Sequence, residues 1–108
     1  MLTFNLKKEW FEKIKSGEKT HEYRKVKYYW TIIIKNYFDF LWWDIDCLKG
    51  GDIYYPRLKD IILQNGYTGE KLHARVISIK IVDGTYTDLK INKDVYDIEF
   101  ELIKDCAE

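Results

Sequence analysis

One short stretch of the chain, Gly17 to Arg24, gathers side chains that could do chemistry, and it reads Gly-Glu-Lys-Thr-His-Glu-Tyr-Arg. Thr20, Glu22 and Arg24 alternate along it, so a strand would carry all three on one face, while Lys19 lies in the turn before them. A buried or half-buried lysine, glutamate and arginine cost free energy unless they pair or hold a ligand. We therefore expect the functional site at this stretch.

The same residues have a structural alternative, in which Lys19, Glu22 and Arg24 form an internal ion-pair cluster at a helix-to-strand junction and bind nothing. The sequence also lacks the motifs of several common enzyme classes. The chain has no Ser-His-Asp set in a recognisable frame, no Gly-x-x-x-x-Gly-Lys loop and no Gly-x-Gly-x-x-Gly fingerprint. Nucleotide hydrolysis by those routes is excluded.

Metal-ligating residues are sparse and scattered. His21 and His73 are far apart and flanked by charged residues, which is typical of surface or cross-strand histidines. Cys47 and Cys106 have no histidine at metal-ligand spacing. We therefore expect no metal and no cofactor, and we expect the thiols to be buried or idle.

The elements around the stretch follow from hydrophobic periodicity. Residues 2–6 alternate apolar and polar, which predicts a strand, and Trp10, Phe11 and Ile14 recur at helical spacing before Gly17, a typical helix-ending residue. The period then drops to two, which predicts a strand over 20–24.

The middle of the chain is less regular. A stripe from Trp30 to Leu41 predicts a helix, although its β-branched run 31–34 taken alone favours a strand. Residues 37–49 have no clean period and are expected to be irregular structure covering the core. Residues 53–55 predict a strand that ends at Pro56. Residues 58–62 suggest a helical turn, and Asn65-Gly66 could equally close a hairpin.

Two late strands are predicted over 71–82 and 96–102. In the first, the apolar face switches between Val76 and Ile77, which indicates a β-bulge or sharp bend of the kind that turns a barrel corner. The second alternates apolar residues with acidic ones, so we expect an acidic outer face. If the two strands pair, these carboxylates would lie near His73 or Arg75.

Bulk composition is that of one globular domain spanning residues 1–108, with 46% hydrophobic and 33% charged residues. No apolar run approaches the roughly 20 residues that a membrane span needs, and the N-terminus does not resemble a signal peptide, so we expect a cytoplasmic protein without membrane contact.

Charge is distributed unevenly along the chain. The net charge is zero, yet residues 1–36 hold nine Lys/Arg against four Asp/Glu. That basic half could face an anionic ligand, and the neutral whole argues against strong sequence-blind binding to nucleic acid. Two solvated faces of opposite sign are the alternative interpretation.

The pattern Gly17-x-Lys19-x-x-Glu22-x-Arg24, with Phe11-x-x-Ile14 before it, resembles the signature of the ASCH domain, a branch of the PUA-like superfamily. Gly51-Asp52-Ile53, Gly66-Tyr67 and the closing segment 96–100 extend the resemblance over nearly the whole chain. It implies an α+β fold, a small PUA-like mixed β-barrel with two or three packed helices. It also implies a cleft between the first helix and the barrel that recognises RNA or a nucleotide-like small molecule.

When the family's motif is matched to this sequence residue by residue, the resemblance implies that the ligand-binding residues are Gly17, Lys19, Thr20, Glu22 and Arg24. Lys19 and Arg24 would supply positive charge, and Glu22 would orient Lys19 or accept hydrogen bonds from a base or ribose. The alternative is a small hydrolase, acylcytidine amidohydrolase-like or ribonuclease-like, with Lys19 and Glu22 as catalytic residues.

The amidohydrolase-like branch carries a threonine where this chain has Glu22, together with a glutamate from a later strand. For a hydrolase, Lys19 would be a base or activate the nucleophile, and Glu22 or Glu99 would be the general acid or base. Thr20 lies two residues away from Glu22, which shifts its hydroxyl by roughly 6–7 Å along a strand. The motif therefore favours binding over amide hydrolysis.

Overall fold

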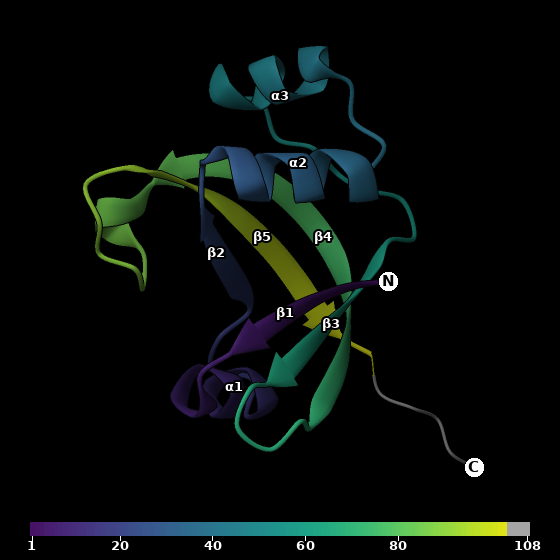
Figure 1. The fold of residues 1–108 in the computed structure, drawn as a ribbon, viewed down its shortest axis with the longest axis vertical. Coiled ribbons are helices and arrows are strands. Elements are labelled where there is room, and N and C mark those ends of the chain that lie inside the picture. The colour runs from purple at the N-terminus through teal and green to yellow at the C-terminus, as the bar shows by residue number, and fades with distance from the viewer. Residues whose placement is uncertain (104–108) are drawn as a thin grey trace.

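The computed structural model describes residues 1–103, so Cys106 lies outside the described residues. Within this range one five-stranded sheet is packed with three α-helices, an α+β arrangement (Figure 1). The elements in chain order are β1 (Leu2–Leu6), α1 (Lys8–Lys15), β2 (His21–Lys25), α2 (Tyr28–Tyr37), α3 (Trp42–Lys49), β3 (Asp60–Asn65), β4 (Lys71–Asp83), the 3₁₀ turn η1 (Gly84–Tyr86) and β5 (Asp94–Leu102). No helix among the described residues is long and apolar enough to cross a membrane.

The sheet is mixed and curled into a half-barrel. Its strand order is β1-β3-β4-β5-β2, with β1 parallel to β3 and every other pair antiparallel. Curling brings the two edge strands toward each other, and the Arg24 Nη2 atom donates a hydrogen bond to the Asn5 carbonyl, 3.1 Å away, across the gap. The predicted α+β fold with a mixed, curved sheet is confirmed at this level.

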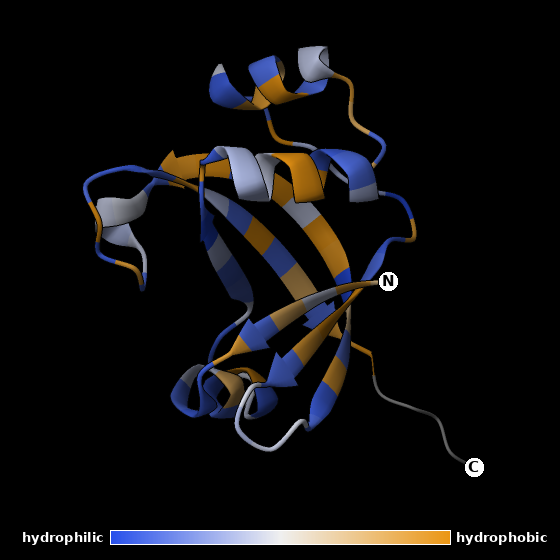
Figure 2. Cartoon of the chain, viewed as in Figure 1, coloured by the Kyte–Doolittle hydropathy of each residue, from blue (hydrophilic) through white to orange (hydrophobic). Residues whose placement is uncertain are grey.

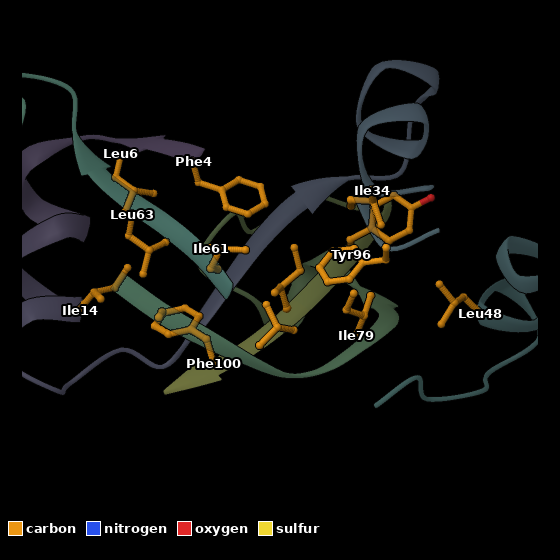
Figure 3. Packing of buried hydrophobic residues seen from close by; sticks show 14 of the residues in the cluster. Phe4, Leu6, Ile14, Ile34, Leu48, Ile61, Leu63, Ile79, Tyr96 and Phe100 are labelled. Atoms are coloured by element: carbon orange, nitrogen blue, oxygen red, sulfur yellow. The ribbon is translucent and has the colours of Figure 1, made fainter. Parts of the chain in front are cut away.

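The hollow of the curled sheet is filled by apolar side chains from β1, β3, β4 and β5 and from the helices (Figure 3). Phe4, Ile61, Ile79 and Ile98 are fully buried there. Tyr96 is also fully buried, and its hydroxyl is 2.7 Å from Thr31 Oγ1, so the buried phenol keeps a hydrogen-bond partner. Helix α1 lies at one end of the half-barrel and α2 at the other, with α3 beyond α2 (Figure 1).

The strands predicted from alternation are present, and β4 and β5 carry alternating hydrophilic and hydrophobic residues in Figure 2. The register of β4 against β5 shifts between Val76 and Ser78, which confirms the bulge predicted at the switch of apolar face. Gly17, with φ of +86°, follows the last turn of α1, and its N–H bonds the Ile14 carbonyl at 3.0 Å. The helix stop is therefore also confirmed.

Two predictions for the middle of the chain are wrong. Helix α2 ends at Tyr37 rather than Leu41, because Asp39 adopts a φ of +57° that an α-helix cannot continue through. Residues 42–49 form α3 rather than irregular structure. Only Ile45 and Leu48 of this helix are buried, whereas its two tryptophans are exposed. The exposed tryptophans therefore obscured the helical spacing of the buried residues in the sequence.

Of the two alternatives for residues 58–66, the hairpin is correct. Strand β3 runs antiparallel to β4, and the turn between them is held by Asn65 Oδ1, which accepts hydrogen bonds from the N–H groups of Tyr67 (2.8 Å) and Thr68 (3.3 Å). The strand predicted over 53–55 is reduced to a single bridge between Tyr54 and Ile79.

The acidic outer face predicted for the last strand is wrong at Asp97, which is only 5% exposed. Strand β2 pairs alongside β5 and places His21 Nδ1 2.6 Å from the Asp97 carboxylate. Arg75 does lie opposite Glu101 in the register, but both Arg75 and His73 bond the Asp60 carboxylate instead. The cross-strand placement predicted for the two histidines is confirmed.

Candidate functional site

A cavity of about 370 Å³ opens at the gap between the edge strands β1 and β2. Its walls come from the end of β1, from α1, from β2, from the start of α2 and from the segment between η1 and β5. Lys19, Glu22 and Arg24 all line it, so the structure brings together the three charged residues of the predicted motif. They border an open cavity and pair with one another at the same time.

Arg24 is held on several sides. Its guanidinium carbon lies 5.0 Å from the centre of the Phe4 ring and 4.7 Å from that of Trp30. Nη2 is 2.7 Å from the Glu22 carboxylate, and Nε is buried without a hydrogen-bond partner among the described residues. A buried donor without a partner costs free energy, which the ion pair with Glu22 and the contacts with the two rings must offset.

Glu22 is the buried carboxylate of the site, and its side chain is 7% exposed. Burial raises the pKa of this carboxyl, and the positive charges of Arg24 and Lys19 act in the opposite direction. The Lys19 Nζ atom is 4.0 Å from the carboxylate on the side away from the guanidinium contact. Burial and charge pairing therefore have opposite effects on the pKa of Glu22.

Lys19 is nearly enclosed, with 9% of its side chain exposed. Its Nζ lies 2.5 Å from the Asp88 carboxylate, 4.8 Å from the centre of the Tyr23 ring and 5.7 Å from that of Trp10. The lysine charge is therefore balanced by a carboxylate from a distant part of the chain and faces two aromatic rings.

Asp88 reaches the site because the base of its loop is fixed. Gly84 N–H donates to the Lys93 carbonyl at 2.8 Å, and the Thr87 hydroxyl donates to the Gly84 carbonyl at 2.8 Å. A Cβ atom at residue 84 would lie 2.5 Å from the Lys93 carbonyl oxygen, so only glycine fits there. This closure presents Asp88 and Leu89 to the cavity.

Tyr23 contributes a neutral ring to the cavity wall. Burial, with added repulsion from Asp97, Asp88 and Glu22, raises the pKa of its phenol to about 12. The hydroxyl therefore stays protonated through the physiological range.

Two of the predicted ligand-binding residues do not line the cavity. Gly17 ends α1, and Thr20 is exposed, with its carbonyl accepting a hydrogen bond from the Phe100 N–H at 3.0 Å. Thr20 instead borders a smaller hollow of about 220 Å³ together with His21. Glu99, the candidate late carboxylate, is also absent from the cavity wall and lies 4.0 Å from His21 Nε2.

Several cavity residues are outside the predicted set, namely Lys7, Trp10, Lys25, Lys27, Trp30 and Asp88. The basic N-terminal half of the sequence was a signal for the three lysines, whereas Asp88 lies in a loop without periodicity. No group of three or more metal-ligating side chains occurs within residues 1–103.

Comparison of the chain with protein-family models, with curated proteins and with solved structures found no match. The resemblance to the ASCH domain stays a prediction.

Proposed function

We propose that the protein binds RNA or a nucleotide-like small molecule in the cavity between β1 and β2. The observation that carries the proposal is the combination of three aromatic side chains, Trp10, Tyr23 and Trp30, with cationic side chains around one opening. Nucleotides offer the matching pair of features, because a base stacks on aromatic rings and a phosphate attracts lysine and arginine.

The charges within the cavity indicate how such a ligand would lie. Its two carboxylates, Glu22 and Asp88, are matched by Arg24 and Lys19. Lys7, Lys25 and Lys27 are exposed at the opening and add positive charge that these carboxylates do not balance. A phosphate would therefore bind at the opening, and the base would enter toward the aromatic rings.

The ASCH-like motif supports the same proposal, because the cavity lies between α1 and the sheet and is lined by Lys19, Glu22 and Arg24. We also propose that the half-barrel is PUA-like. We further propose that the protein is cytoplasmic, where RNA and nucleotides are abundant.

Exchange of both Lys25 and Lys27 for alanine is expected to weaken binding of a 5′-mononucleotide roughly tenfold, since two phosphate-facing charges are lost. Isothermal titration calorimetry at fixed moderate salt measures the effect. The matched control exchanges Lys49 and Lys71, which are exposed outside the cavity. An equal loss in the control, or a wild-type protein that binds no nucleotide, would count against the proposal.

A hydrolase is the second candidate, favoured by the buried Glu22 carboxyl beside Lys19. A carboxyl whose pKa is raised can donate a proton to a leaving group. The cavity wall contains no serine, threonine or cysteine among the described residues, so the nucleophile would be water for acylcytidine, and water or the neighbouring ribose 2′-hydroxyl for RNA. Product formation from acylcytidine or short RNA should then disappear in Glu22→Gln, and inert substrates with wild-type protein would eliminate this candidate.

A further inference from the structure

We propose that the ligand is single-stranded RNA and that a second hollow, beside Tyr67, holds the nucleotide next to the one in the cavity. The inference rests on the proposed function of the cavity and extends it from a single nucleotide to a chain.

The second hollow directly adjoins the cavity. It has a volume of about 660 Å³ and is more open, and Asn5, Leu6 and Lys7 line both spaces. The end of β1 is therefore their common wall. A ligand that continues over this wall passes from the rings of the cavity to the turn between β3 and β4, whose Gly66 and Tyr67 line the far side.

Tyr67 is presented by a fixed turn and has no packing role of its own. The ring is 84% exposed. Asn65 beneath it is buried and accepts the Tyr67 N–H, while the Gly66 N–H donates to the Leu6 carbonyl at 2.9 Å and ties the turn to the end of β1. An exposed aromatic ring on an ordered backbone is a ready stacking surface for a base.

Charge at the second hollow selects a polyanion as its occupant. Lys7 and Lys8 line it and are exposed, and none of the described residues in its wall is acidic. Lys7, on the shared wall, is placed to meet the phosphate that joins two successive nucleotides. One base in the cavity, one phosphate at Lys7 and one base on Tyr67 form a continuous path.

The test compares a 5′-mononucleotide with a short single-stranded RNA of mixed sequence by calorimetry in the same buffer. The RNA should bind wild-type protein at least roughly tenfold more tightly, because stacking of one further base contributes about that factor. Tyr67→Ala should remove the gain and leave mononucleotide affinity unchanged. Tyr55→Ala, which removes another exposed tyrosine that lines neither space, should leave both affinities unchanged.

Two results would overturn the inference: RNA that binds no more tightly than the mononucleotide, or a gain that survives Tyr67→Ala. Neither result contradicts the proposed function of the cavity, provided that mononucleotide binding still depends on Lys25 and Lys27. Absence of mononucleotide binding, by contrast, contradicts the proposed function itself. Thermal unfolding of Tyr67→Ala should match wild type, since the ring is exposed.

Discussion

Replacing Arg24 with alanine is expected to lower the free energy of unfolding by about 3 kcal/mol, the scale seen when one partner of a buried ion pair is removed. The change leaves the Glu22 carboxylate buried without the guanidinium 2.7 Å away. It also removes the guanidinium that packs against the Phe4 and Trp30 rings and the hydrogen bond to Asn5 that links the edge strands. Urea unfolding followed by circular dichroism measures the loss.

Arg75→Ala is the matched control, because this arginine pairs with Asp60 on the exposed side of the sheet. Surface pairs contribute about 0–1 kcal/mol, so the control should lose far less. A double variant, Glu22→Gln with Arg24→Ala, should recover part of the stability, since a neutral amide costs less to bury than a carboxylate. Equal losses for Arg24→Ala and Arg75→Ala would contradict the assigned role of Arg24.

The amount by which Arg24→Ala lowers the free energy of unfolding should grow as the pH rises. Burial already raises the pKa of Glu22 above its ordinary value of 4.5, and removing the opposing arginine charge raises it further. The folded variant then holds the Glu22 proton at pH values where the unfolded chain releases it, so stability falls as pH rises above that ordinary value. A loss of the same size at about pH 5 and about pH 8 would contradict ionisation of Glu22 as the cause.

Asp88→Asn is expected to tighten binding of a mononucleotide roughly tenfold, the factor that corresponds to one charge-assisted hydrogen bond. In the free protein the Asp88 carboxylate lies 2.5 Å from Lys19 Nζ and so competes with a ligand oxygen on the base or ribose for the lysine. Asparagine keeps the shape of the side chain and removes its charge. In the variant, Lys19 can contact the ligand without first breaking its ion pair with Asp88.

Calorimetry with Glu18→Gln supplies the control, since Glu18 is exposed and its nearest cation is Lys13 at 3.9 Å. Adding Lys19→Met to Asp88→Asn should abolish the gain, because the gain acts through the lysine. Unchanged affinity in Asp88→Asn would mean that Asp88 does not compete with the ligand.

Periodicity predicted the parts of the fold in which one face of an element is buried and the other is not. The alternation along β1 follows burial, and in β4 the switch of apolar face falls at the bulge, although Ile77 itself is exposed. In β5 the sequence alternates but burial does not, because Val95 to Ile98 are all buried. Strand β3 was ambiguous because its apolar residues, Ile61, Ile62 and Leu63, are consecutive and so show no period, and a turn could be placed at either end. Helix α3 has only two buried residues in eight, which is too few to set a period.

The site was predictable where neighbouring residues form it. Parity along β2 placed Glu22 and Arg24 on the same side, and the structure brings Lys19 beside them. Asp88 comes from a distant loop that the fold brings to this edge, and nothing local in its sequence marks it. Trp30 was predicted only as part of the apolar stripe of the helix that follows β2. The two interpretations of the motif, ion-pair cluster and ligand site, describe the same residues, because the pairs form the wall of an open cavity.

The four tryptophans allow the most direct test of the proposed nucleotide site. Trp10 and Trp30 line the cavity, whereas Trp42 and Trp43 are exposed on α3 outside it. In a ¹H–¹⁵N NMR titration with a 5′-mononucleotide, the indole N–H signals of Trp10 and Trp30 should shift progressively and saturate, while those of Trp42 and Trp43 stay fixed. Signals that all stay fixed, or shifts confined to Trp42 and Trp43, would contradict a nucleotide site between β1 and β2.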